Sequence, residues 1–180
     1  MSNTALISFF CPDRIGIVAS VAGRLFDLGA NLGDTTFAVL GSGAKFTTVC
    51  ELPDALSLQE LEDELSGLTE LENAQLTVAP FELSLEQGPS ARITHRIKVA
   101  GGDRPGLIAR LCEVFIQFKA NIVRLNAVRN PEDKDDMYVI RIGVWIPEDN
   151  IKSCLATVAN TAGGLGLECS WQDVRARPGS

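Results

Sequence analysis

Two short segments of this 180-residue chain place an aspartate, an arginine and a glycine directly before a helix-like hydrophobic pattern. They are Asp13, Arg14, Ile15 and Gly16 in the first segment and, ninety residues later, Asp103, Arg104, Pro105 and Gly106 in the second. The first N–H groups of a helix lack partners within the helix, and together with the helix dipole they favour an anion. A glycine, which has no Cβ, lets a ligand approach that backbone closely. The two segments could therefore bind the carboxylate of a small molecule.

An asparagine follows each aspartate eighteen residues later, as Asn31 and Asn121. Each would open the strand after the helix, and we expect its side-chain amide to offer a donor and an acceptor near the loop. A purely structural interpretation stays open for both copies: the aspartate caps the helix, the glycine packs it against a sheet, and the asparagine begins a turn. For one copy alone this capping chemistry is the commoner explanation, and its repetition favours a functional role.

The first half of the chain shows a hydrophobic periodicity that predicts strand, helix, two strands, helix and strand. The strands are expected over residues 4–11, 31–40, 44–52 and 74–85. Asp13 is the predicted N-cap of the first helix, and Ser57 with Glu60 has the spacing of a capping box at the start of the second. Gly-Ser-Gly at residues 41–43 predicts a tight antiparallel hairpin.

The second half repeats this order, and its first strand alternates clearly. Ile93, His95, Ile97 and Val99 are predicted to share its apolar face. Strands over about 121–129 and 137–146 flank a highly charged loop, residues 130–136, which is expected to be a solvated hairpin. Arg92, Arg96 and Lys98 form a basic row on one strand, too small to outweigh the acidic total.

This order of elements predicts an α+β protein of two tandem ferredoxin-like βαββαβ domains, each a four-stranded antiparallel sheet with both helices on one face. The predicted boundaries are 1–85 for the first domain, 86–91 for a linker, 92–174 for the second domain and 175–180 for a tail. The open face of the strand at 137–146 would carry Met137, Val139, Arg141 and Trp145, which is more apolar than a solvated face requires. We therefore expect a homodimer or a higher homo-oligomer.

Composition and charge restrict the classes of partner. A net charge of −7 and a pI near 4.7 argue against direct contact with nucleic acid, because such binding depends on neutralising phosphates with Lys and Arg. No apolar run reaches the roughly 20 residues of a membrane span and the N-terminus does not resemble a signal peptide, so a cytoplasmic protein is expected. The five cysteines form no C-x-x-C pair and are expected to be reduced structural thiols.

Residues that could catalyse a reaction are scarce. His95 is the only histidine and lies on the apolar-alternating face of a strand, where a hydrogen-bonded structural imidazole is expected. The sequence contains no nucleotide-binding loop, no cluster of metal ligands and no recognisable catalytic triad. We therefore predict that the protein is not an enzyme and has no catalytic residues, metal or cofactor.

Asp-Arg-x-Gly after a first strand, then an apolar helix and Ala-Asn opening the next strand, resembles the ACT domain, a small-molecule regulatory module. The resemblance covers nearly the whole chain in two copies. Residues 11–19, Cys-Pro-Asp-Arg-Ile-Gly-Ile-Val-Ala, are similar to the first ACT unit of glycine cleavage system transcriptional repressor-like proteins and to the N-terminal ACT unit of formyltetrahydrofolate deformylases. A catalytic domain follows in the deformylases, whereas a second ACT unit follows here, so the layout favours the repressor-like group.

This resemblance implies that a small, glycine-like amino acid binds at interfaces between ACT units. The implied binding residues are Asp13, Arg14, Ile15, Gly16 and Asn31 in one copy and Asp103, Arg104, Pro105, Gly106 and Asn121 in the other. The copies differ at Ile15 and Pro105, and Gly101-Gly102 replaces the Cys11-Pro12 lead-in, so the two sites need not be equivalent.

Three functions remain open at this point. The leading hypothesis is a non-enzymatic sensor that binds an amino acid and modulates a partner protein, such as a transcriptional regulator of glycine cleavage, without contacting DNA. The alternative is a detached regulatory subunit of an amino-acid or one-carbon biosynthetic enzyme, and the third is a small enzyme on the same scaffold. Fold analogy alone does not choose among them.

Overall fold

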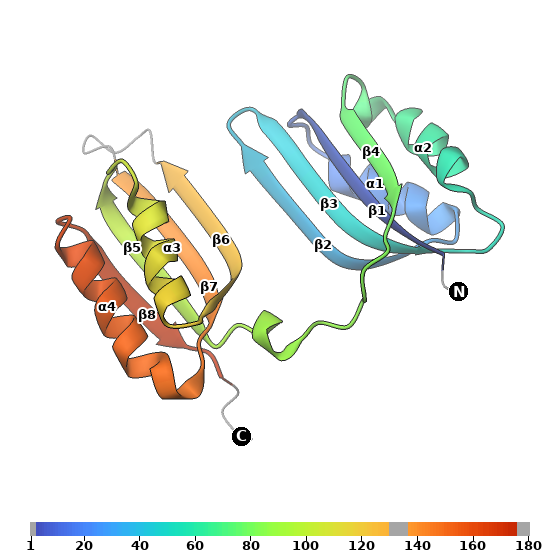
Figure 1. Ribbon diagram of the computed structural model, residues 1–180. Helices are drawn as coiled ribbons and strands as arrows, with labels where there is room; N and C mark the ends of the chain where they lie inside the picture. Colours follow the sequence, from blue (N-terminus) through green and yellow to red (C-terminus); the bar gives the residue numbers. More distant parts are fainter. Residues whose placement is uncertain (1–2, 130–136, 176–180) are drawn as a thin grey trace, which may run out of the picture. The chain divides into compact units, whose positions relative to one another are not determined.

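The computed structural model describes residues 3–129 and 137–175. The chain divides into two compact units, residues 1–83 and residues 84–180 (Figure 1). The predicted charged loop, 130–136, and all of the predicted tail except Arg175 lie outside the described residues. No helix in the described part of the chain is both long enough and apolar enough to cross a membrane.

The first unit contains four strands and two α-helices in the predicted order. These are β1 (Asn3–Pro12), α1 (Ile17–Asp27), β2 (Asn31–Leu40), β3 (Gly43–Leu52), α2 (Leu58–Ser66) and β4 (Gln75–Pro80), with a 3₁₀ turn, η1, at Thr69–Leu71. The strands form one antiparallel sheet in the order β2-β3-β1-β4, and both helices cover the same face of it (Figure 1).

The second unit repeats this architecture. Its elements are β5 (His95–Gly102), α3 (Leu107–Gln117), β6 (Asn121–Arg129), β7 (Met137–Trp145), α4 (Ile151–Gly163) and β8 (Glu168–Asp173), with 3₁₀ turns η2 (Pro89–Ala91) and η3 (Glu148–Asn150). The antiparallel strand order β6-β7-β5-β8 corresponds to that of the first unit. The prediction of two tandem ferredoxin-like domains is confirmed.

Each unit buries its own hydrophobic core between its sheet and its helices. In the first unit the rings of Phe9 and Phe46 stack with centroids 5.1 Å apart, and Leu25 from α1 and Leu61 from α2 are fully buried with them. In the second unit Val99 and Ile140, which pair across β5 and β7, occupy the equivalent central position. Apolar residues at helical and alternating spacing therefore explain both cores.

Two local predictions that depend on turn chemistry are confirmed. The Ser57 hydroxyl accepts the Glu60 N–H at 3.2 Å and the Glu60 carboxylate accepts the Ser57 N–H at 2.9 Å, which forms the capping box of α2. In the hairpin between β2 and β3, Leu40 pairs with Gly43, and Gly41 adopts a left-handed φ of 61°. A residue with a side chain would be strained in that conformation.

The predicted start of the second unit's first strand is wrong. The strand begins at His95, so Ile93 does not share the apolar face of His95 and Ile97. Ile93 instead packs over Gly143 from the helix-free side of the sheet, where a Cβ built on Gly143 would lie 2.6 Å from Ile93 Cδ1. Thr94 is buried, and its hydroxyl accepts the Ile146 N–H at 3.0 Å. Burial of Thr94 and packing of Ile93 over Gly143 therefore override the simple alternation of the sequence.

The helix-free face of β7 has the composition expected from the sequence. Met137, Val139 and Trp145 lie on it and are half-buried, and Arg141 lies between them and is exposed. Trp171, on β8, lies on the opposite face, at the edge of the sheet, where it keeps 46% of its surface exposed.

Candidate ligand-binding loops

Helix α1 begins at Gly16 rather than at Asp13. Gly16 is the N-cap residue, with φ 94° and ψ −9° in the left-handed region, and no side chain caps the helix. The prediction that Asp13 caps the helix is therefore wrong. Its carboxylate lies three residues too early, because the glycine turn separates it from the first helical bond, from Ser20 N–H to Gly16 O at 2.8 Å.

Helix α3 begins in the same way. Gly106 is its N-cap, with φ 77° and ψ 5°, again without a side-chain cap. No acidic residue occupies the first turn of either helix. A Cβ built on Gly16 or Gly106 would have no other atom within 4 Å, so open space lies above both glycines. The positive ends of both helices are therefore reachable by a small anion.

The first loop is held by contacts within its own unit. The N–H of Asp13 donates to Ser42 O at 2.9 Å, which ties the loop to the β2–β3 hairpin. Arg14 points toward η1, where its guanidinium donates to Thr69 O at 3.0 Å and Glu72 O at 3.5 Å. Ile15 is fully exposed at the tip. Arg14 therefore supports the loop, and Ile15 is left free for contact with another surface.

The second loop is held differently. The Asp103 carboxylate forms an ion pair with Arg129 from β6, whereas Arg14 in the first loop bonds backbone carbonyls. Gly101, with φ 153°, lies directly against Leu167, and a Cβ there would be 2.4 Å from Leu167 Cδ2. The left-handed backbone conformation and the close approach of Leu167 therefore both favour glycine at position 101. The two loops share backbone geometry and differ in the side chains that hold them.

Asn31 and Asn121 do not lie beside the loops of their own units, which corrects the expectation from the sequence. Asn31 pairs with Glu51, which pairs with Thr4, eight residues before Pro12 on β1. At about 3.3 Å per residue this separates Asn31 from the loop by about 26 Å. Asn121 opens β6 in the same way, opposite Trp145. The reason is topological: α1 and α3 carry the chain back to the opposite end of the sheet.

The two asparagine side chains have different surroundings. Asn121 Nδ2 donates to Ser90 O at 2.9 Å and so ties β6 to η2. The exposed Asn31 side chain forms no hydrogen bond with any residue that the structure describes. The amide of Asn31 is therefore free to bind another molecule, whereas the Asn121 donor is already used within its unit.

A small cavity of about 290 Å³ lies at the end of β1. Pro12, Ser42, Asn73, Phe10 and Leu40 are among the residues that line it. Phe10, which points to the helix-free face, and the buried Cys11 both line it. The sequence does not reveal this cavity, because Asn73, just before β4, comes near Pro12 and Ser42 only through the strand order β2-β3-β1-β4.

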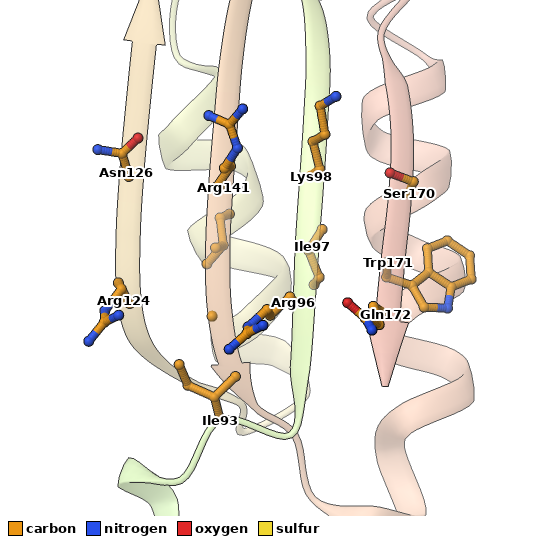
Figure 2. Close-up of a pocket in the computed structure, with 12 residues that line it drawn as sticks. Ile93, Arg96, Ile97, Lys98, Arg124, Asn126, Arg141, Ser170, Trp171 and Gln172 are labelled. Carbon is orange, nitrogen blue, oxygen red and sulfur yellow. The ribbon is translucent and has the colours of Figure 1, made fainter. Parts of the chain in front are cut away.

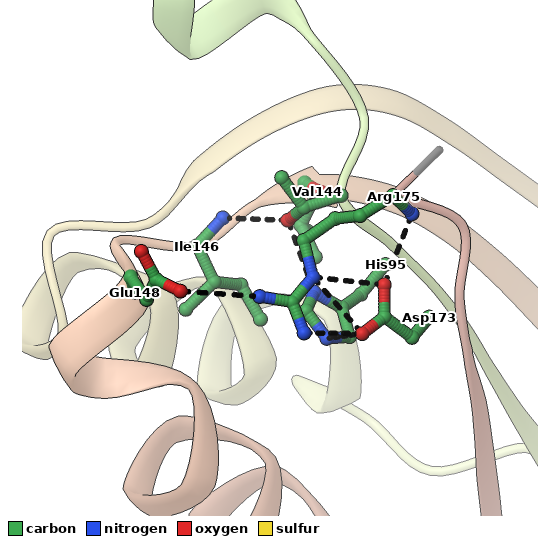
Figure 3. A network of polar contacts seen from close by, with 7 residues as sticks. His95, Val144, Ile146, Glu148, Asp173 and Arg175 are labelled. Atoms are coloured by element: carbon green, nitrogen blue, oxygen red, sulfur yellow. Dashed lines mark hydrogen bonds and ion pairs between the residues drawn. The ribbon is translucent and has the colours of Figure 1, made fainter. Parts of the chain in front are cut away.

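His95 is a buried, hydrogen-bonded imidazole, as predicted (Figure 3). Its Nδ1 lies 3.0 Å from Thr94 Oγ1, and its Nε2 lies 3.9 Å from a carboxylate oxygen of Asp173. Arg175 Nε donates to the same carboxylate at 2.9 Å. Hydrogen bonding from Arg175 lowers the pKa of Asp173, and burial lowers the pKa of His95.

The second unit should lose stability as the pH falls from 7 to 5. Burial lowers the folded-state pKa of His95, and the Asp173 charge offsets this only in part. The unfolded chain therefore binds the proton more readily below about pH 6.5, so acid favours unfolding. Tryptophan fluorescence during urea unfolding should show this loss, and His95→Gln should reduce it. An unchanged pH dependence in the variant would exclude His95 as its source.

The cysteines and acidic residues do not form a recognisable catalytic or metal site in the described part of the chain. All five thiols are free, and burial raises the pKa of Cys50 and of Cys154 to about 11. Such thiols are poor nucleophiles near neutral pH. Among the residues described, no three His, Cys, Asp or Glu side chains are grouped so that they could hold a metal ion.

Comparison with known proteins identifies the fold. A scan against protein-family models found no match, and neither did a search of curated proteins. Among solved structures, an unknown protein from Galdieria sulphuraria is 19% identical, covering 97% of this chain and 100% of its own, with a TM-score of 0.74. The chain therefore has a tandem fold that another protein shares from end to end.

That fold consists of two ferredoxin-like βαββαβ units in one chain, the architecture that the resemblance to tandem ACT proteins implied. A protein described as a "putative glycine cleavage system transcriptional repressor" shares it, with 16% identity over 98% of this chain and 99% of its own and a TM-score of 0.69. At such identities the likeness establishes the architecture, and the function must be argued from the residues.

Proposed function

We propose that the protein is a non-enzymatic sensor that binds a small, glycine-like amino acid between ACT units and modulates a partner protein. The observation that carries this proposal is the uncapped start of α1. Its N-cap is a glycine under open space, and neither a capping side chain nor an acidic residue competes for the first N–H groups. An amino-acid carboxylate matches this charge and size.

The ligand site that we propose is composite. Because Asn31 lies about 26 Å from the loop of its own unit, one amino acid cannot contact both within that unit. If a second unit packed beside the first with its sheet reversed end to end, its asparagine would lie at the loop of the first unit. Asn31 is the better donor for this role, since the Asn121 amide already binds Ser90. Ligand binding would then stabilise a particular pairing of units, which a partner protein could detect.

By analogy with the putative glycine cleavage system transcriptional repressor that shares this fold, we propose that the pairing acts on transcription. The chain's net charge of −7 favours action through a protein over direct contact with DNA. A cytoplasmic location agrees with this role. A sensor of a metabolite pool needs only micromolar to millimolar affinity, which a few charge-assisted hydrogen bonds can supply.

Sedimentation velocity tests the composite site. We expect at least a dimer at micromolar concentration, because the open sheet faces carry half-buried apolar residues such as Val139 and Trp145. Adding glycine or serine at about 10 mM should increase the fraction associated, since a ligand bound at an interface favours the associated state by mass action. A strict monomer that no amino acid changes would contradict association between chains.

A further inference from the structure

The helix-free face of the second sheet carries four cationic side chains in two neighbouring rows (Figure 2). Strand register gives the rows directly. The first runs Arg124, Gly143, Arg96 and Gln172 across β6, β7, β5 and β8, and the second runs Asn126, Arg141, Lys98 and Ser170. No carboxylate occupies either row.

These cations have no partner in the described part of the chain. None of the four forms a hydrogen bond or an ion pair with another described residue. Lys98 and Arg141 are directly opposite each other on β5 and β7, and like charges in that position destabilise a sheet. An anion bound between the rows would remove this repulsion.

The charge of the chain is divided unequally between its units. Residues 1–83 contain 12 Asp and Glu but only 3 Lys and Arg, whereas residues 84–180 contain 11 and 13. The four cations therefore lie on the less acidic unit. The strongly negative total, which argues against a nucleic-acid partner, conceals this local positive surface.

The two rows form a groove rather than a flat surface. Its volume is about 470 Å³, within the range of small-molecule sites. Gly143 contributes no side chain, so Arg124 and Arg96 stand on either side of a gap whose base is covered by Ile93 (Figure 2). Asn126, Ser170 and Gln172 add neutral polar groups. The groove thus offers an apolar base, cations on both sides and hydrogen-bonding groups around them.

We propose that this groove binds an organic phosphate of nucleotide size with three or four negative charges. Arginine presents planar, forked donors that match phosphate oxygens, and four cations can neutralise a triphosphate. Ile93 and the backbone of β7 supply a surface for the organic part. The groove's limited volume favours a small molecule over a protein segment or a nucleic acid. The groove lies on the same helix-free face as Val139 and Trp145, so ATP binding requires that the association proposed above leave Arg96 and Arg141 uncovered. None of its residues belongs to the α1 or α3 loops.

Calorimetric titration of the full chain with ATP, with inorganic tripolyphosphate and with adenosine tests the proposal. We expect ATP to bind with a dissociation constant below about 1 mM, tripolyphosphate to bind more weakly, and adenosine not to bind. Arg96→Gln and Arg141→Gln should each weaken ATP binding at least about tenfold, since each removes charge-assisted hydrogen bonds. Both side chains are exposed, so circular dichroism should show folded variants.

Arg110→Gln is the matched control, because Arg110 is an exposed arginine on α3, on the other face of the sheet. It should leave ATP binding unchanged. The proposal is overturned if neither ATP nor tripolyphosphate binds at about 5 mM, or if Arg110→Gln weakens binding as much as Arg96→Gln. Binding of a glutamate-rich peptide or an oligonucleotide without ATP would also overturn it. Glycine binding should be unchanged in all three variants, which separates this test from that of the proposed function.

Discussion

Replacing Asn31 by alanine should weaken amino-acid binding at least about tenfold while leaving the protein as stable as before. The Asn31 side chain is exposed and bonds no described residue, so its removal should change the free energy of unfolding by less than about 0.5 kcal/mol. A hydrogen bond to a charged ligand contributes about 1.5 to 3 kcal/mol, which corresponds to roughly 10-fold to 150-fold in affinity. Calorimetric titration and urea unfolding measure the two quantities separately.

Asn121→Ala is the matched comparison and should behave in the opposite way. Its amide donates to Ser90 O at 2.9 Å, and losing that bond should cost about 0.5 to 1.5 kcal/mol of stability. Amino-acid affinity should change little if Asn31 supplies the working donor. If instead Asn121→Ala abolishes binding and Asn31→Ala does not, the second copy carries the site. If neither variant loses affinity, the asparagines are structural.

The second large effect is on stability. Phe46→Ala should lower the free energy of unfolding of the first unit by about 3 to 5 kcal/mol. Phe46 is fully buried and stacks on Phe9, so its loss leaves a cavity in the core. Because each unit has its own core, the second unit should be unaffected. Both tryptophans, Trp145 and Trp171, lie in the second unit. In urea, circular dichroism should therefore show an early transition while tryptophan fluorescence keeps its midpoint.

Ile140→Ala provides the reciprocal variant. Ile140 is fully buried in β7 opposite Val99, the position equivalent to Phe46 opposite Phe9. Ile140→Ala should lower the free energy of unfolding of the second unit by about 2 to 5 kcal/mol. The fluorescence midpoint should therefore fall, while the transition of the first unit stays in place. Equal shifts of both probes in either variant would mean that the two units unfold together.

The fold was largely predictable because each element has a local signal. The repeat of ninety residues, the glycines at 41 and 43 and the capping box at Ser57 are all visible in the sequence and all confirmed. The start of β5 was missed because Ile93 continues the apolar alternation although its side chain packs on the other face over Gly143. Alternation indicates a strand but does not determine where its pairing begins.

The candidate sites were less predictable, since they depend on geometry between distant residues. Asp13 has the chemistry of an N-cap, yet the left-handed Gly16 takes that position. Asn31 follows the loop closely in sequence, and α1 carries it to the other end of the sheet. Arg96 and Lys98 were recognised as a short basic row, whereas Arg124 and Arg141 join it only through the order β6-β7-β5-β8.

Calorimetric titration of the intact protein with glycine, serine and the other amino acids tests the proposed sensor function most directly. At least one small amino acid should bind with a dissociation constant between about 1 µM and 1 mM. It should also raise the melting temperature, because a ligand that binds only the folded state stabilises it. If no amino acid binds below about 10 mM, the uncapped loops at Gly16 and Gly106 are structural turns and the sensor proposal is wrong.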